Sequence, residues 1–167
     1  SVESRNKKGD KLKIIAGYNN LANFYSIIGK YDEAINFWKR AIEISETVGN
    51  LTQTAHIYNN IGISHFKRRN YQSAIENYQK AMAIYRTIGD IPGMANVLGN
   101  MGEVLIEEYK LSEAYDNLIQ AEKLYEKTGD RGGICEIKRL LFLMFLYVGD
   151  AKRAREVFKW IDENCER

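Results

Sequence analysis

Three asparagines spaced 40 residues apart, Asn20, Asn60 and Asn100, are the clearest candidates for chemistry in this chain. A side-chain amide offers both a donor and an acceptor, so it matches the N–H and C=O groups of a peptide main chain, which no charged side chain can do. Asparagine is also a poor residue inside a helix and costs about half a kcal/mol there. Two interpretations of these amides are open: they hold an extended peptide, or they bond to a neighbouring helix.

The other residue types that could do chemistry form no catalytic or metal-binding motif. The sequence has no phosphate-binding loop, no Gly-x-Ser-x-Gly and no His-Glu-x-x-His. His65 is expected to pack between helices, whereas His56 is a candidate contact for a partner without a paired nucleophile. Cys135 and Cys165 are not in a Cys-x-x-Cys pair, and we expect two free thiols. The sequence predicts no enzyme activity, no cofactor and no metal.

The asparagines share their spacing because the whole sequence repeats every 40 residues. An Asp or Asn follows glycine at four equally spaced positions: Gly9, Gly49, Gly89 and Gly129. A fixed period of this length is typical of a solenoid, in which each unit buries its apolar face only against its neighbours. We therefore expect one domain over residues 1–167, with an N-terminal extension at 1–8 and repeats at 9–48, 49–88, 89–128 and 129–167.

Each repeat should contain two helices. Apolar residues recur three and four positions apart on both sides of a break at Gly29, which is typical of amphipathic helices. Each recurring glycine can adopt the left-handed conformation that ends a helix, and the Asp or Asn after it can cap the next helix. We expect eight antiparallel helices with breaks near residues 29, 49, 70, 89, 109, 129 and 149, and Pro92 in the opening turn of a helix.

Small residues occupy fixed places in these helices and let two helices approach closely. They are Ala22, Gly62 and Gly102 in the first helices, and Ala34, Ala74, Ala114 and Ala154 at the start of the second helices. Bulky residues, among them Trp38 and Tyr78, alternate with them. HEAT and armadillo repeats have similar periods, but this pattern resembles the tetratricopeptide repeat. The longer unit is similar to the branch that includes kinesin light chains, spindle-orientation adaptors and bacterial peptide-pheromone receptors.

The resemblance implies an all-α, right-handed superhelical solenoid of four tetratricopeptide-like helix-turn-helix repeats, whose first helices line a concave groove. Members of the long-repeat branch hold a peptide main chain there with asparagines. The residues expected to contact a peptide are Asn19, Asn20, Asn23, His56, Asn59, Asn60, Lys67, Asn96, Asn100 and Glu103. A clamp for a terminal carboxylate is not expected, because asparagines stand where other family members have its basic residues.

The first helix of the fourth repeat differs because residues 140–148 are all apolar. Leu140, Leu143 and Leu146 would fall on the concave side, and Tyr147 would add to the same apolar patch. Left in water, they would form an apolar patch larger than a soluble monomer usually exposes. We expect either a weak homodimer through these residues or coverage by the last helix.

The composition is that of an ordinary soluble protein, with 45% hydrophobic and 28% charged residues. A net charge of +2 gives no reason to expect nucleic acid, and no stretch reaches the roughly 18 apolar residues of a membrane span. The first residues contain no signal-peptide core, so a cytoplasmic location is expected.

The sequence therefore predicts a non-catalytic scaffold that binds an extended peptide or partner segment in its groove. Lys67 lies in a repeat with five basic residues and one acidic residue, whereas Glu103 lies in one with three basic and eight acidic residues. Such polarity can select a charged partner. The alternative is a structural or dimerisation segment of a larger regulator whose effector domain is not in this chain.

Overall fold

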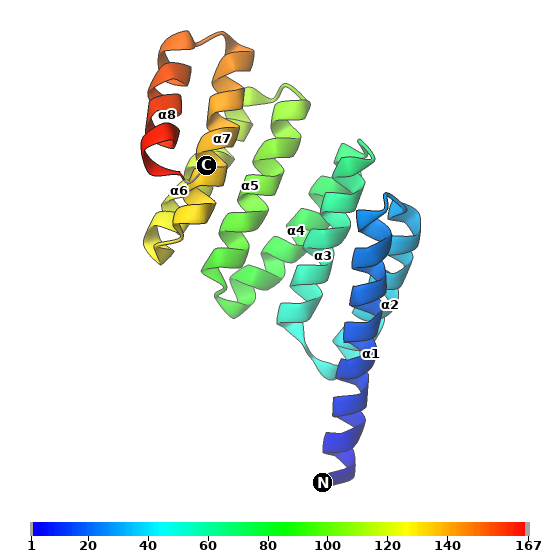
Figure 1. Cartoon of the computed structure of the whole chain (residues 1–167). Helices are drawn as coiled ribbons and strands as arrows, with labels where there is room; N and C mark the ends of the chain where they lie inside the picture. The colour runs from blue at the N-terminus through cyan, green and yellow to red at the C-terminus, as the bar shows by residue number, and fades with distance from the viewer. Residues whose placement is uncertain (1, 166–167) are drawn as a thin grey trace. The chain divides into compact units, whose positions relative to one another are not determined.

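The computed structural model describes the backbone of residues 2–165 and the side chains of residue 7 and residues 9–165. Eight α-helices follow one another in this part of the chain, and it contains no strand (Figure 1). Their bounds are α1 (Val2–Ile27), α2 (Tyr31–Val48), α3 (Leu51–Lys67), α4 (Tyr71–Ile88), α5 (Ile91–Glu107), α6 (Leu111–Thr128), α7 (Arg131–Val148) and α8 (Ala151–Asn164). The all-α prediction is confirmed, and each predicted break falls between two helices.

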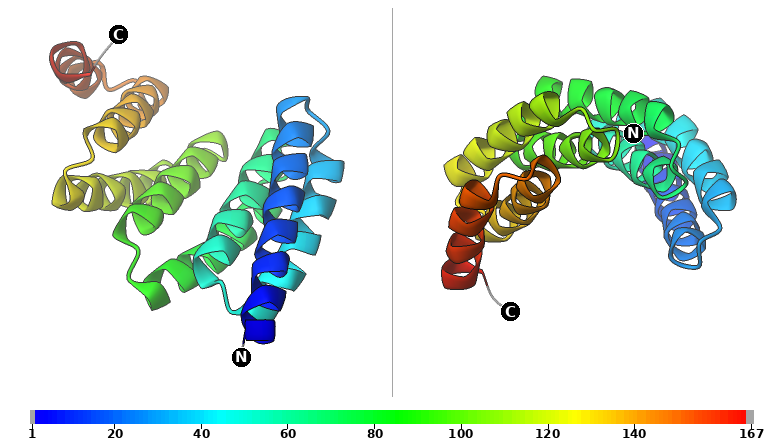
Figure 2. Two further views of the ribbon diagram at one scale, coloured as in Figure 1. Left: turned by 60° about the horizontal axis from the view of Figure 1, so that its bottom comes forward. Right: turned by 90° about the horizontal axis from the view of Figure 1, so that it is seen from above.

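The helices group into two compact units, Ser1–Ile88 and Gly89–Arg167, so the boundary in the sequence falls at the start of the third repeat. In the first unit α1 packs against α2, α3 packs against α4, and α2 packs against α3. In the second unit the pairs are α5 with α6 and α7 with α8, and α7 also contacts α5 and α6. Figure 2 shows these antiparallel hairpins from two further sides. The single domain and the handedness of the superhelix stay predictions.

The joints between repeats are built as predicted. The glycines that follow α2, α4 and α6 are left-handed, with φ values of 66°, 70° and 72° for Gly49, Gly89 and Gly129. The next side chain then accepts a hydrogen bond from the backbone N–H three residues later, at distances of 2.9 to 3.2 Å from Asn50, Asp90 and Asp130. These bonds satisfy amide groups that a helix start leaves free. Pro92 lies in the first turn of α5.

Gly9 does not end a helix, so that part of the prediction is wrong. The α1 helix begins at Val2 and continues through Gly9 and Asp10 to Ile27. Glycine permits the left-handed conformation but does not impose it. Here the residues before Gly9 extend the first helix instead of packing as a separate one.

The turn inside each repeat also needs a left-handed residue, but glycine supplies it in only two repeats. Gly29 and Gly149 both have φ of 77°, whereas Arg69 and Tyr109 have φ of 58° and 56°. A residue with a Cβ costs about 1–2 kcal/mol in this conformation.

Arg69→Gly is therefore expected to raise the free energy of unfolding by about 1 kcal/mol. Arg69 is exposed, so the change removes little packing. Urea unfolding of the variant, compared with Arg69→Ala as a control that keeps the strain, measures this. A glycine variant no more stable than the alanine variant would contradict the expectation.

The core confirms the register of small and bulky residues. Ala34, Ala74 and Ala114 are fully buried where the second helices begin. A Cβ built on Gly62 would lie 2.5 Å from the ring of Tyr78, and the Tyr78 side chain is itself only 1% exposed. Close approach of the first and second helices in the second repeat therefore requires glycine at position 62.

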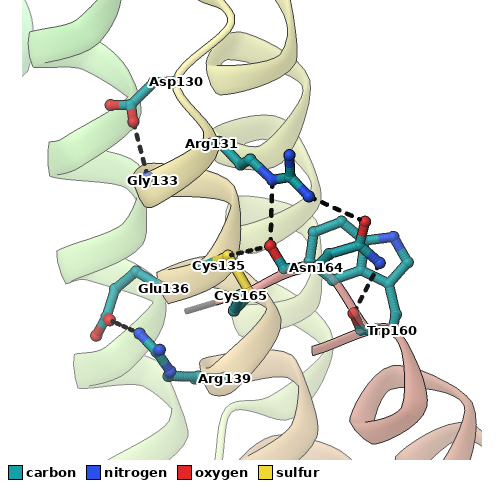
Figure 3. The surroundings of a disulfide bond; sticks show 9 residues. All are labelled: Asp130, Arg131, Gly133, Cys135, Glu136, Arg139, Trp160, Asn164 and Cys165. Carbon is teal, nitrogen blue, oxygen red and sulfur yellow. Dashed lines mark hydrogen bonds and ion pairs between the residues drawn. A yellow bond between two sulfur atoms is a disulfide. The ribbon is translucent and has the colours of Figure 1, made fainter. Parts of the chain in front are cut away.

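The two cysteines form a disulfide, so the prediction of free thiols is wrong. Cys135 lies in the second turn of α7, and Cys165 directly follows α8 (Figure 3). They are 30 residues apart in sequence, but the antiparallel hairpin brings their Cα atoms to 5.8 Å. Arg131 holds the same two helix ends together, since its Nε donates to the backbone oxygen of Asn164 at 3.1 Å.

A second contact ties α8 to the helices beside it. The Lys138 Nζ on α7 lies 2.6 Å from Glu122 Oε1 on α6, and both side chains are mostly buried. The same ammonium group lies 5.3 Å from the centre of the Trp160 ring on α8. One charged side chain thus connects three helices of the second unit.

Candidate functional site

A pocket of about 310 Å³ lies on the first unit among α1, α2 and α3. The residues that line it are Asn23, Ser26 and Ile27 of α1, Trp38 of α2, and Asn60 and Ile63 of α3. None of these residues is charged. The pocket brings together two of the predicted peptide contacts, Asn23 and Asn60, because both come from the first helices of adjacent repeats.

The amides of Asn20, Asn23 and Asn60 are open to an incoming partner. Asn20 and Asn23 are exposed, and Asn60 is half-buried. Within the residues that the structure describes, these three amides form no hydrogen bond to another group. Asn19 is half-buried, and its Oδ1 atom has no hydrogen-bond partner in that part of the chain. Nothing in the described first unit therefore uses these amides to join neighbouring helices.

Three other predicted contacts of the first unit lie in different surroundings. Asn59 is 8% exposed, so its side chain belongs to the helix packing more than to an open surface. His56 is exposed, and its Nδ1 lies 3.0 Å from the hydroxyl of Tyr85 on α4. Lys67 is exposed, with its Nζ 5.7 Å from the ring of Phe66. Of these three, only Lys67 and His56 present an exposed side chain.

The predicted contacts of the second unit bond partly to each other. Asn100 Nδ2 donates to Asn96 Oδ1 at 3.3 Å, one turn away on α5. Asn96 also hydrogen-bonds to Tyr125 on α6; burial raises the pKa of Tyr125, and this hydrogen bond opposes the rise. Glu103 is half-buried on the same helix. These amides thus have a role in helix packing that Asn20, Asn23 and Asn60 lack.

His65 lies on α3, and its packing between helices stays a prediction. It is half-buried, and its Nδ1 has no hydrogen-bond partner among the described residues. Burial lowers the pKa of His65, and the nearby charges of Arg68 and Lys39 lower it further. These effects favour the neutral form of the ring.

Sequence reasoning missed Trp38 as a site residue because it treated this side chain only as core. Trp38 is 2% exposed, yet it lines the pocket, and its Nε1 donor has no partner in the described chain. The sequence itself contained one indication that Trp38 differs from its equivalents. The equivalent residues of the other repeats are Tyr78, Leu118 and Phe158, and none of these carries an indole N–H.

The apolar face of α7 is only partly covered. Leu140 is half-buried, whereas Leu143, Leu146 and Tyr147 are 37%, 52% and 48% exposed. The last helix packs against another side of α7, where the rings of Phe142 and Phe158 lie 5.7 Å apart. The expectation that α8 covers this face is therefore wrong, and pairing of two copies stays a prediction.

Two other kinds of site are absent from the described residues. No group of three or more His, Cys, Asp or Glu side chains within them could hold a metal ion. None of the helices in that part of the chain is long and apolar enough to cross a membrane.

Comparison with known proteins supports the resemblance seen in the sequence. Residues 13–87 match the family model described as the tetratricopeptide repeat. No curated protein matches the chain. The crystal structure of BtubC (BKLC) from P. vanneervenii is similar, with 20% identity and a TM-score of 0.78 over 89% of this chain and 62% of that one.

Two further structures are also similar. Aspartyl phosphate phosphatase F from Bacillus subtilis has 14% identity and a TM-score of 0.83, over 88% of this chain and 39% of that one. The Rap conjugation gene regulator of the plasmid pLS20, in complex with the Phr* peptide, has 18% identity and a TM-score of 0.79, over 92% and 43%. At these identities the likeness shows the fold alone, and the chain spans less than two thirds of each structure.

Proposed function

Because residues 13–87 match the family model of the tetratricopeptide repeat, we propose that this protein is a non-catalytic scaffold that binds an extended segment of a partner. The observation that carries the proposal is the set of free amides at Asn20, Asn23 and Asn60 on the first helices. Their helix cost of about half a kcal/mol each has no offset within the described first unit. Hydrogen bonds from these amides to a bound partner would offset that cost.

The chemistry of these amides fits a peptide main chain. Each offers one acceptor and one donor group, as a peptide bond does, and so binds it whatever its side chains are. Lys67 and Glu103 would then favour acidic and basic partner side chains near them. The Rap regulator, which shares the fold, is described in complex with a peptide. That complex supports the class of partner, and the residues involved here are our proposal.

The amides of Asn20, Asn23 and Asn60 are expected to be required for binding. Peptides are selected on the whole chain from a random-peptide phage library, and their affinities are measured by fluorescence polarisation. Changing all three asparagines to alanine should weaken binding by at least about a hundredfold, since each lost hydrogen bond is worth roughly 1 kcal/mol. The melting temperature should hold or rise slightly, because alanine is the better helix former.

Asn36 and Asn117, on the second helices α2 and α6, provide a matched control. Changing both to alanine should leave peptide affinity unchanged. If the triple variant unfolds, the amides stabilise helix packing. If it binds with unchanged affinity, the peptide lies on another surface.

A second candidate function, self-association, is favoured by the exposure of Leu143, Leu146 and Tyr147. Sedimentation velocity over a concentration series should show a weak dimer, and Leu143→Glu should abolish it because a charge would be buried unpaired in the contact. Leu12→Glu is the matched control, since Leu12 is similarly exposed at 39% but lies on α1. A parent chain that stays monomeric, or equal effects of both substitutions, would contradict pairing through α7.

A further inference from the structure

We propose that the pocket lined by α1, α2 and α3 is a subsite for one uncharged amide group of a bound polypeptide, with the indole N–H of Trp38 donating to its carbonyl oxygen. The inference rests on the proposed scaffold function and specifies which chemical group the groove recognises. Three observations support it: a buried donor without a partner, a lining without charge, and the occurrence of this combination only where the first and second repeats meet.

The first observation is the state of the indole donor. Trp38 is 2% exposed, and its Nε1 has no acceptor among the residues that the structure describes. An indole N–H can only donate, and leaving a buried donor unpaired costs free energy. Trp38 is one of the residues that line the pocket, so we place the acceptor oxygen there; because Nε1 itself exposes less than 1 Å², the hydrogen bond requires a lining side chain to move slightly.

The second observation is the absence of charge in the lining. The polar residues around the pocket are Asn23, Ser26 and Asn60. A carboxylate would lose its hydration there without gaining a cation, and an ammonium group would find no anion. An amide group has one acceptor and at least one donor, which the two asparagine amides can both satisfy. Ile27 and Ile63 can pack against the carbon atoms that carry it.

The third observation is that the arrangement occurs once among the four repeats. The residues equivalent to Trp38 are Tyr78, Leu118 and Phe158, and those equivalent to Asn23 are Ile63, Glu103 and Leu143. The pocket is therefore a property of this repeat pair and not of the fold in general. It would set the position of a peptide along the groove by one recognised amide.

The test uses the two indole N–H signals of the ¹⁵N-labelled whole chain, since the sequence has two tryptophans. Trp160→Phe assigns them. Four probes are titrated: N-methylacetamide for a main-chain amide, acetamide for an Asn or Gln side chain, acetate and methylammonium. One or both amides should shift the Trp38 signal saturably, with acetate and methylammonium at least about tenfold weaker. The Trp160 signal is the internal control.

A Trp38 signal that moves no more than that of Trp160 with either amide would overturn the inference. Asn60→Asp provides an independent arm, because it keeps the size of the side chain and adds a charge at a half-buried position. It should weaken amide binding about tenfold and make methylammonium the tighter probe. An unchanged order of the four probes would count against the subsite, and Asn23→Asp repeats the test at an exposed position.

The scaffold proposal and this inference can fail separately. If phage-selected peptides bind and depend on the asparagines, but no amide shifts Trp38, only the subsite falls. If the amides shift Trp38 but no peptide can be selected, the subsite stands as a small-molecule site and the scaffold proposal falls.

Discussion

Reduction of the Cys135–Cys165 disulfide is expected to lower the free energy of unfolding of the second unit by about 3–4 kcal/mol. The bond closes a loop with a sequence separation of 30, and closing a loop of that size restricts the unfolded chain by roughly this amount. The loss should fall first on α8, because Ala154 is the one buried residue among those that α8 contributes. Few apolar contacts would then hold this helix against α7.

The measurement is urea unfolding with and without a reductant, followed by circular dichroism. Each unit contains one tryptophan, so the fluorescence of Trp160 reports the second unit and that of Trp38 the first. Only the Trp160 transition should move on reduction. A Cys135→Ala/Cys165→Ala variant should match the reduced protein and ignore the reductant. Equal midpoints for oxidised and reduced wild-type protein would contradict the expectation.

The disulfide also bears on where the protein works. The sequence-based prediction of a cytoplasmic location went together with the prediction of free thiols. Disulfides persist mainly in oxidising compartments and are rare in the cytosol. In a reducing compartment, the second unit would lack the disulfide and have a lower free energy of unfolding. The reduction experiment therefore also measures how stable the protein would be in such a compartment.

Gly62→Ala and Gly17→Ala are expected to change stability in opposite directions. Both glycines lie inside helices, where alanine is favoured by about 1 kcal/mol. A Cβ on Gly17 meets nothing within 4 Å, so that variant should gain this amount. A Cβ on Gly62 would lie 2.5 Å from the buried Tyr78 ring, and overpacking at the upper end of its usual range costs about 3 kcal/mol. The net loss at Gly62 should be about 2 kcal/mol.

Thermal and urea unfolding of both variants check this pair. The Gly17 variant serves as the control for helix propensity, because the substitution and the kind of helix position are the same. Should Gly62→Ala also stabilise the protein, the first and second helices of this repeat would be able to separate, and the tight packing between them would not be a constraint on the sequence.

The sequence predicted the helix ends well because their causes are local. A left-handed glycine and the capping side chain after it, such as Gly129 and Asp130, act within one turn of the chain. The disulfide was missed because it depends on how far α8 runs beside α7, which no local pattern reports. The exposure of Leu146 was misjudged for the same reason, since an apolar helix can pack by one side only.

For the candidate site, the repeat spacing correctly brought Asn23 and Asn60 to one pocket. It could not separate Asn59 from Asn60, because adjacent residues on a helix differ by about 100° in direction and a small rotation decides which one is buried. Nor could it show that the Trp38 donor is unpaired. That property depends on which acceptors surround the ring in three dimensions.

The joints between repeats have a consequence for protein engineering. Gly49, Gly89 and Gly129 agree in φ within a few degrees, and each is followed by a cap of the same geometry. A 40-residue segment that runs from one such joint to the next therefore begins and ends in the same backbone conformation as the neighbouring segment. We therefore expect that repeats can be duplicated or deleted at these joints without redesigning a turn, so that the number of repeats in the chain can be changed one at a time.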